Sequence, residues 1–505
     1  MLELFYGKNL FGNITDKRFL EINIGEWINS PKRQAQLLAE RYYRGEHDIL
    51  QKTREMIGKD GKMHPVKYLP NNRIVDNQYR RLVDQITNFE VGQPITFDTD
   101  LSTTTGQKFA ELLGKLFGKQ ALRRIKYVIR HAVSEGISWL YVWEDKQNET
   151  LAFSIFQASE VLPFWADSEH EKLDCALRLF TVEDYGDDGE RKFVDKVEVF
   201  DKIGIHNFNY TNGALIEDYD TPVVPYLQVK VGDNVVPYSW QRCPLIPFRR
   251  GELEQTLLSV CKQLQDTLNQ THSDFHDALQ ENCKKSTLVV KNYQGTKWDE
   301  FLHNLHTLGI IPVRTTEGGE GGVEVLKIDI DANTYKSVVD LIKRAMVEAC
   351  GGFDAKDDRL GSNPNQMNIE SMYADIEITA NDLESEFSAS FEQLLWFVRQ
   401  YLAHTNKDNP EGIDFQNEKA EVIFNRDMMV NETEVIQNCA NSVDLISRET
   451  ILKNHSWVDN PKAEMDRLRD EHAEDEQAAD SYNKAFGDHN HDDQKGEVTG
   501  DEEEQ

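Results

Sequence analysis

Three long amphipathic helical patterns in the C-terminal half constrain the fold of this chain more than any other feature. The first spans about 252–283, where apolar side chains recur every three or four residues. At 1.5 Å per residue such a helix is roughly 45 Å long, which is unusual in a globular protein. Two further patterns cover about 332–349 and about 368–404. Their apolar stripes need partners, either within one buried core or on neighbouring subunits of an oligomer.

Two segments interrupt these helices. Residues 284–330 predict a small α/β insertion, with strands at 288–290, 310–313 and 323–328 and a short helix over about 298–308. The glycine-rich residues 318–322 in this insertion suit a flexible hairpin tip. Residues 351–366 are rich in glycine, asparagine and mixed charges, which predicts a loop. This loop is longer than an ordinary connector, which indicates function or disorder.

The N-terminal half predicts an α+β domain of about 250 residues. Residues 1–30 suggest an irregular or strand-containing arm. We expect helices from Ser30 to Gly45, over about 74–91 and over about 105–134, followed by strands between 137 and 245. Asp187-Asp188-Gly189 is a typical hairpin turn. At the other end, 430–475 predicts a helical module, and the acidic residues 476–505 predict a disordered tail. The predicted class is therefore multidomain α+β.

The chain is strongly acidic, with 88 Asp and Glu against 56 Lys and Arg and a net charge of −32. This balance disfavours a broad DNA-binding surface, because cationic side chains supply affinity for the phosphate backbone. It is compatible with DNA passing close to a like-charged wall, and equally with acidity that only aids solubility. The apolar runs are too short to cross a bilayer, and the N-terminus lacks a signal peptide, so we expect an intracellular product without membrane contact.

No catalytic constellation can be assembled from the sequence. It lacks a phosphate-binding GxxxxGK[ST] loop, a GxSxG elbow and an HExxH helix. The six cysteines are scattered without zinc-ligand spacing, which predicts reduced core thiols. Asp357-Asp358 could serve a metal-dependent nuclease, but they lie in a charged loop beside Lys356 and Arg359. We therefore expect no enzyme activity, no cofactor and no metal, and a nuclease remains the weaker alternative.

Several segments, in order, resemble the portal proteins of long-tailed phages of Gram-positive hosts. Together they cover most of residues 30–475. These segments are RYYRGEHDIL (41–50), NNRIVDN (71–77), VGQPIT (91–96), the helix-to-strand passage 132–143, PLIPF (244–248), ISRET (446–450) and EMDRL (464–468).

The resemblance implies a portal-type architecture. The predicted parts are a wing (1–250), a stem helix (251–283), a clip (284–330), a second stem helix (331–350), a tunnel loop (351–366), a long wing helix with its return (367–429), a crown (430–475) and the acidic tail (476–505).

The resemblance also implies a function. Such proteins form rings of usually twelve copies at one capsid vertex, conduct double-stranded DNA during packaging and ejection, and act in the virion after assembly in the host cytoplasm. Implied partners are terminase, which carries the ATPase, the major capsid and scaffolding proteins, and a head-completion adaptor. Another head protein, such as a minor capsid or adaptor component, is the main alternative. The residues expected to face DNA are Asp354, Lys356, Asp357, Asp358, Arg359, Asn363 and Asn365, with possible phosphate contacts at Lys284 and Lys285.

Overall fold

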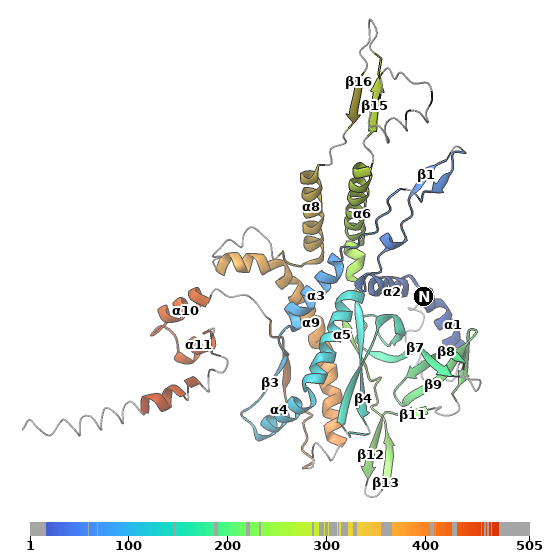
Figure 1. The fold of residues 1–505 in the computed structure, drawn as a ribbon. Helices are drawn as coiled ribbons and strands as arrows, with labels where there is room; N and C mark the ends of the chain where they lie inside the picture. Colours follow the sequence, from blue (N-terminus) through green and yellow to red (C-terminus); the bar gives the residue numbers. More distant parts are fainter. Residues whose placement is uncertain are drawn as a thin grey trace, which may run out of the picture. The chain divides into compact units, whose positions relative to one another are not determined.

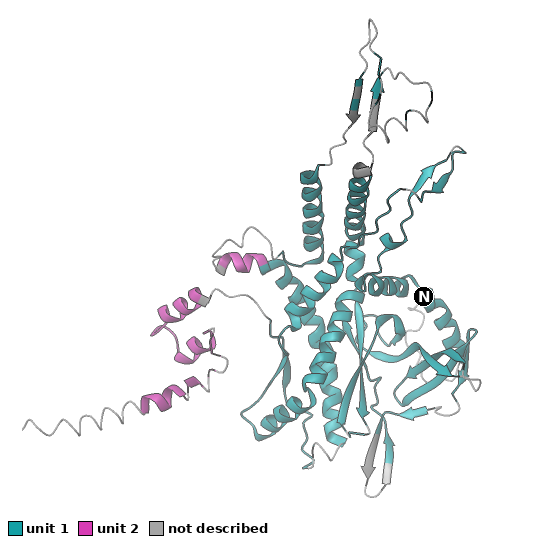
Figure 2. Cartoon of the chain, viewed as in Figure 1, with its two compact units in different colours: residues 1–355, 373–428 teal, residues 356–372, 429–505 magenta. Residues whose placement is uncertain are grey.

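A computed structural model of the chain contains two compact units, which are described one at a time (Figure 2). The first comprises residues 1–355 and 373–428, and the second comprises 356–372 and 429–505. The structure describes residues 17–473 with gaps. The gaps are residues 59, 68, 146, 149, 186–189, 219–222, 232–233, 285–286, 292–296, 298–300, 302–310, 312, 315–321, 327–330, 355–365, 405–408, 410, 427–431, 456, 459–460, 462–463 and 466.

The first unit begins with helices whose ends follow from local sequence (Figure 1). Ser30 caps α2 by accepting a hydrogen bond from the Arg33 amide, and Pro31 opens that helix. Helix α5 ends at Gly136, whose φ of +87° suits glycine because it has no Cβ. The helices are α1 (Lys17–Ile28), α2 (Pro31–Tyr43), α3 (Gln78–Val91), α4 (Thr104–Leu116) and α5 (Lys119–Glu135), with 3₁₀ turns η3 (Asp48–Gln51) and η4 (Ala158–Glu160).

Two predictions in this region are wrong. The expected irregular arm over residues 1–30 contains helix α1, which buries Leu20 and Ile24 against the neighbouring sheet. Residues 1–16 lie outside the described part. The single helix expected over about 105–134 is two helices, because the chain leaves the helical conformation at Phe117 and Gly118 before α5 begins.

Two antiparallel sheets follow α5. The smaller has the order β14-β4-β5, and its edge strand β14 places Pro247 opposite Trp139, as suits a residue without an amide hydrogen. The larger has the order β10-β9-β8-β7-β6, with β11 also paired to β9. The strands are β4 (Ile137–Asp145), β5 (Thr150–Phe156), β14 (Leu245–Arg249), β6 (Val161–Trp165), β7 (Leu173–Tyr185), β8 (Arg191–Phe200), β9 (Gly204–Thr211), β10 (Ala214–Glu217) and β11 (Val223–Pro225).

Smaller hairpins and pairs complete the sheets. Strands β7 and β8 pair up to Tyr185 and Arg191, as a hairpin requires, although the predicted turn 187–189 lies outside the described residues. The remaining pairs of this unit are β1 (Glu55–Ile57) with β2 (Met63–Pro65), β3 (Thr96–Thr99) with β17 (Ala420–Ile423), and β12 (Leu227–Val231) with β13 (Asn234–Tyr238).

The long helices predicted from the sequence are present. Helices α6 (Leu257–Lys284) and α8 (Ala332–Cys350) lie side by side (Figure 1). Between them, β15 (Thr287–Lys291) pairs antiparallel with β16 (Gly322–Leu326), as expected for two strands of the insertion. The predicted helix at 298–308, the strand at 310–313 and most of the glycine-rich tip lie largely or wholly outside the described residues.

Helix α9 (Gln366–His404) carries the aromatic core of the first unit from Tyr373 onward. Phe391 is 1% exposed, and its ring lies 5.5 Å from Phe248, 6.2 Å from Phe97 and 5.9 Å from Phe424. The Ser390 hydroxyl also donates a 2.6 Å hydrogen bond to the carbonyl of Pro247. This helix therefore ties the smaller sheet to the β3–β17 pair.

The described part of the second unit is helical and buries little. It contains the first residues of α9 (366–372), α10 (Glu432–Asn441), α11 (Arg448–Lys453) and helical residues between 461 and 473. Val443, Leu445, Ile446 and Trp457 are exposed, and α11 buries no residue. The predicted α+β class is confirmed. Among the described residues, no helix is both long and apolar enough to span a bilayer.

Candidate functional site

Of the residues predicted to meet DNA, Asp354 lies in the described structure, at the point where the loop leaves helix α8. Lys284 is the last residue of α6. The other predicted residues lie outside the described part, namely Lys285, Lys356, Asp357, Asp358, Arg359, Asn363 and Asn365. The structure therefore describes the helices and the base from which the predicted tunnel loop starts.

Two glycines end helix α8 and begin the loop. Gly351 adopts a φ of +64° and caps the helix, and the Gly352 amide donates a 3.0 Å hydrogen bond to the Val347 carbonyl. The Thr379 hydroxyl donates to the Gly351 carbonyl at 3.2 Å. A Cβ on Gly351 would lie 2.1 Å from that hydroxyl oxygen, so no other residue fits this turn without displacing its neighbour.

The next residue, Phe353, is clamped by one glutamine of α3. The Gln85 amide nitrogen donates to the Phe353 carbonyl at 2.8 Å, and the Gln85 side-chain oxygen accepts from the Phe353 amide at 3.2 Å. The Phe353 ring lies 4.7 Å from that of Tyr373 on α9. One side chain thus satisfies both backbone groups at the start of the loop, as a neighbouring β-strand would.

We expect Gln85→Leu to release the base of the loop. Loss of two backbone hydrogen bonds should lower the local opening free energy by about 1–2 kcal/mol, so the Phe353 amide should exchange its hydrogen roughly tenfold faster. Hydrogen exchange of peptides covering residues 351–354 measures this. Asn88→Leu is the matched control, since Asn88 is exposed on the same helix. Equal protection in Gln85→Leu and the control would show that the clamp is unimportant.

A ladder of buried polar side chains on α6 binds the extended segment before α3. Four residues at every fourth helical position, Gln265, Asn269, Ser273 and Asp277, are at most 3% exposed. Each accepts a hydrogen bond from a backbone amide of the segment. Gln265 accepts from the Tyr79 amide at 2.9 Å and Asn269 from the Asp76 amide at 3.0 Å. Ser273 accepts from the Ile74 amide at 3.0 Å and Asp277 from the Asn72 amide at 2.7 Å.

The spacing of the ladder explains why a helix can act here as a strand partner. Four helical residues advance about 6.0 Å, and two extended residues advance about 6.6 Å. Three successive hydrogen bonds of the ladder therefore have nearly the same spacing along α6 and along the extended segment. Asn269 also accepts from the Gln265 amide at 3.1 Å and contacts the Nδ1 of His47 at 2.8 Å, so the rungs are joined to each other and to the turn after α2.

The same segment also binds helix α8. The Lys343 ammonium lies 2.8 Å from the Asp76 carboxylate, and the Nε2 of His272 lies 3.1 Å from it. The rings of Phe275 and Tyr335 stack with centroids 3.7 Å apart between α6 and α8. Asp76 therefore connects both long helices to the segment that leads into α3.

Helix α3 also buries an unpaired carboxyl. Glu90 is fully buried, and its carboxyl oxygens find no hydrogen-bond partner among the described residues. Burial, and then the negative charge of Glu384, raise the pKa of Glu90 to about 8, while Arg426 opposes this shift. Arg426 itself pairs with Glu384 at 2.8 Å. At pH 7 the protonated, neutral form of Glu90 therefore predominates.

The raised pKa of Glu90 predicts that stability falls as pH rises. The unfolded chain releases the Glu90 proton near the ordinary pKa of 4.5, whereas the folded protein keeps it up to about pH 8. The free energy of unfolding therefore falls as the pH rises through this window. Glu90→Gln stays neutral, and its advantage over the parent should grow from near zero at pH 4.5 to on the order of 3 kcal/mol at pH 8. Urea unfolding at pH 5 and pH 8 measures this. The exposed Glu46→Gln is the control, and parallel behaviour of parent and Glu90→Gln would contradict the prediction.

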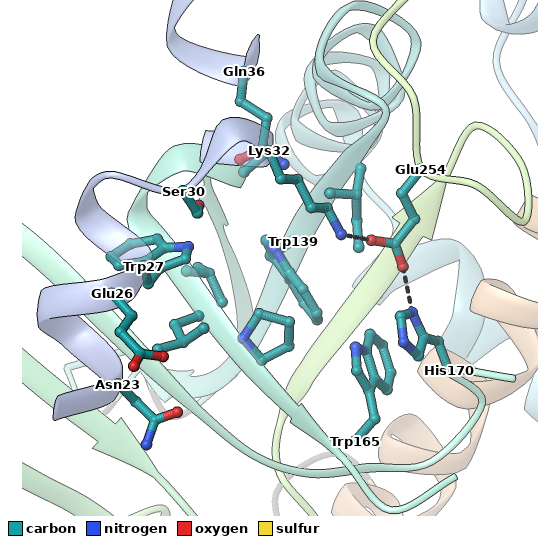
Figure 3. A pocket seen from close by; sticks show the side chains of 15 residues that line it. Asn23, Glu26, Trp27, Ser30, Lys32, Gln36, Trp139, Trp165, His170 and Glu254 are labelled. Carbon is teal, nitrogen blue, oxygen red and sulfur yellow. Dashed lines mark hydrogen bonds and ion pairs between the residues drawn. The ribbon is translucent and has the colours of Figure 1, made fainter. Parts of the chain in front are cut away.

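A pocket of about 320 Å³ lies in the first unit beside the turn that precedes α6 (Figure 3). Its walls include Trp27, Trp139 and Trp165, and its polar side holds Glu254 between Lys32 and His170. Burial alone would raise the pKa of Glu254, but the 2.8 Å hydrogen bond with His170 and the contact with Lys32 lower it overall.

This ion cluster positions the start of α6. Glu254 and His170 adopt positive φ values of 50° and 58°, which non-glycine residues hold only when the surroundings enforce them. A Cβ on Gly136 would lie 2.2 Å from the Glu254 carbonyl, so the turn packs directly on the end of α5. The polar side of the pocket therefore holds the turn before α6 against the end of α5.

The described residues offer no support for the nuclease alternative. They contain no group of three or more histidine, cysteine or carboxylate side chains placed to hold a metal. Asp357 and Asp358 lie outside this part of the chain. The sequence interpretation missed the ladder residues, because it followed the apolar stripe of α6. The available signal was four polar residues at intervals of four in an otherwise amphipathic helix.

Comparisons with known proteins identify the family of the chain. The family model described as phage portal protein, SPP1 Gp6-like, matches residues 30–478. A portal protein of Clostridium phage phiCD119 is 24% identical over 465 residues, which cover 90% of this chain and 96% of that protein. A portal protein of Bacillus phage SPP1 is 25% identical over 437 residues, covering 85% and 82%. The family match extends over far more than half of the chain, and the resemblance inferred from the sequence is confirmed: this chain belongs to the SPP1 Gp6-like family of phage portal proteins.

Proposed function

We propose that the chain is the portal subunit of a tailed phage: a closed ring of about twelve copies at one capsid vertex, whose channel carries double-stranded DNA. The observation that carries this proposal is the family match over residues 30–478, which spans nearly the whole described chain. Both relatives named above are portal proteins and align over most of their lengths.

The elements fit the parts of such a subunit. We assign α6 and α8 to the stem, the insertion with β15 and β16 to the clip, and the sheets with α1–α5 to the wing. Residues 351–366 form the tunnel loop, and the rest of α9 returns into the wing. Residues 430–475 form the crown. The exposed apolar side chains between and after the described crown helices support this assignment, because such short helices need a further surface to be stable.

The charge of the chain suits a conduit. At −32 it offers DNA no broad cationic surface to bind, so DNA can move without a deep energy minimum. The expected close contacts are the mixed charges and amides of the tunnel loop and the two lysines at the stem–clip junction, Lys284 and Lys285.

The chain is a structural component and not an enzyme. ATP hydrolysis belongs to terminase, in agreement with the missing phosphate-binding loop in this sequence. The ring docks terminase during packaging and a head-completion adaptor afterwards, and it joins the major capsid and scaffolding proteins during head assembly. Its location is the portal vertex of the virion.

Site-specific photo-crosslinking tests where the DNA passes. A photoreactive amino acid in place of Lys356 should crosslink to DNA in filled heads and not in empty heads. The same amino acid in place of Lys108, which lies on α4 in the wing, is the control and should give no DNA adduct. Equal labelling at the two positions, or labelling at position 108 alone, would refute the assignment of the loop.

A further inference from the structure

The β1–β2 hairpin has no core of its own. All of its paired residues, Glu55–Ile57 and Met63–Pro65, are exposed. Ile57 lies directly opposite Met63, so both side chains are on one face of the hairpin, where they are 73% and 57% exposed. An isolated two-stranded hairpin is only marginally stable in water, and a further element must cover its apolar face to stabilise it. This face is therefore a candidate contact surface.

Two ion pairs hold the base of this hairpin on helix α6. The Lys52 ammonium lies 2.6 Å from the Asp274 carboxylate, and the Arg54 guanidinium lies 2.5 Å from the carboxylate of Glu281. The Val66 amide donates a 2.8 Å hydrogen bond to the Arg54 carbonyl and thereby closes the base. The hairpin therefore projects from a fixed place on α6.

That place is on the side of α6 that faces away from α8. Phe275 of α6 stacks on Tyr335 of α8 at 3.7 Å, so Phe275 marks the side of α6 that contacts α8. Asp277 comes two residues later, which is about 200° around the helix. It accepts from the Asn72 amide at 2.7 Å and lies 3.7 Å from the Arg54 guanidinium. The hairpin, α6 and α8 thus form a row in that order, as Figure 1 shows.

The other end of the row, helix α8, also exposes an apolar face. Leu341 lies six residues after Tyr335, which is about 240° around the helix, so its side chain is turned away from α6. Leu341 is 67% exposed, and Val338, one turn before it, is 39% exposed. Val338 is about 4.5 Å from Tyr335 along α8. Asp274, which holds the base of the hairpin, is next to Phe275, so the two ends of the row lie at a similar level.

The two faces also carry complementary charges. Glu55 lies two residues before Ile57, on the same face of the hairpin. Arg344 follows Leu341 by three residues, on the same face of α8. Both charged side chains are exposed. A carboxylate thus borders one apolar face and a guanidinium borders the other, as suits two surfaces that meet.

We propose that the hairpin face with Ile57 and Met63 packs against the α8 face with Val338 and Leu341 of a second copy of this chain. A ring repeats one contact between two different surfaces of its subunit. The hairpin and α8 supply two such surfaces at opposite ends of one row. The inference rests on the proposed function, because it names the surfaces through which neighbouring subunits of the ring meet.

Cross-linking of the purified full-length ring tests the contact. A variant with both Ile57→Cys and Leu341→Cys is treated with a short, flexible bismaleimide, and the products are separated on a denaturing gel. Because each subunit then offers one thiol to each neighbour, the links should run around the ring and give a ladder from the dimer up to the full number of copies. Either substitution alone should give no ladder, and the parent protein shows the background from its own six cysteines.

Ile57→Cys combined with Thr267→Cys is the matched control. Thr267 is exposed on α6, eight residues before Phe275. It is about 80° around the helix from the side that contacts α8, and it therefore faces neither end of the row. This variant should give no ladder. A ladder as strong in the control as in the test variant, or links only within single chains, would overturn the proposed contact.

Ile57→Asp separates this contact from ring formation as such. The side chain is exposed in the subunit, so the melting temperature of the dissociated subunit should not change. A carboxylate buried against α8 of the neighbouring copy should raise the protein concentration at which rings dissociate roughly tenfold. Electron microscopy of a dilution series counts the rings.

The outcomes distinguish this contact from the proposed function. Parent rings that give no ladder in the double variant, and rings of Ile57→Asp that resist dilution as well as the parent, would refute the contact and leave the portal assignment standing. A parent protein that forms no rings at any concentration would refute both.

Discussion

Replacement of Phe391 by alanine is expected to lower the free energy of unfolding by about 3–5 kcal/mol, the largest effect of any single change considered for this chain. The Phe391 side chain is 1% exposed and contacts rings from three other segments, those of Phe97, Phe248 and Phe424. Its removal takes apolar surface out of the core and leaves a cavity that rigid helix α9 cannot close. Urea unfolding followed by circular dichroism measures the change.

Helix α9 itself provides the matched control. Ile378 lies on the same helix with 63% of its surface exposed, and Ile378→Ala should change stability by less than about 0.5 kcal/mol. A loss below about 1 kcal/mol in Phe391→Ala, or similar losses in both variants, would mean that α9 does not carry the core of the first unit.

Asn269→Leu should cost about 3 kcal/mol, although leucine has a similar size and is a better helix former. The change leaves the Asp76 amide without an acceptor, removes one of the two acceptors of the Gln265 side-chain amide, and removes the partner of the His47 Nδ1. These groups are buried, so water cannot replace the lost bonds. The segment that leads into α3 should then detach from α6 before the rest of the unit unfolds.

Hydrogen exchange at the amides of residues 72–79, combined with urea unfolding, measures this effect. Gln270→Leu makes the same kind of change at the next helical position, where the glutamine side chain is exposed and donates to the Asp274 carboxylate. That control should stay within about 0.5 kcal/mol of the parent. If Asn269→Leu were as stable as Gln270→Leu, the ladder would not hold the segment.

The sequence predicts those parts of the fold in which periodicity and burial agree. Helix α8 and helix α9 begin and end within a few residues of the expected positions, because their apolar spacing follows the contacts that they make. The start of α3 is different. The apolar pattern from Ile74 predicts helix, yet the helix begins at Gln78, because α6 side chains bind residues 72–76 in an extended conformation. A contact between segments almost 200 residues apart overrides the local preference, and the local pattern carries no trace of it.

The candidate site was predictable in location and less so in detail. The polar loop after the second long helix marks the place, and Gly351 indicates the helix end. The clamp by Gln85 and the ladder on α6 depend on side chains that meet only in the folded unit. Polar residues at intervals of four on α6 were visible, but a solvated helix face gives the same pattern, so only the structure shows that they are buried.

Electron microscopy of the purified full-length protein, together with its native mass, tests the central claim most directly. The account predicts closed rings with a central channel and a mass of roughly 700 kDa for about twelve copies of the 58.2 kDa chain. A protein that remains a 58.2 kDa monomer at micromolar concentration, without rings in the images, would contradict it.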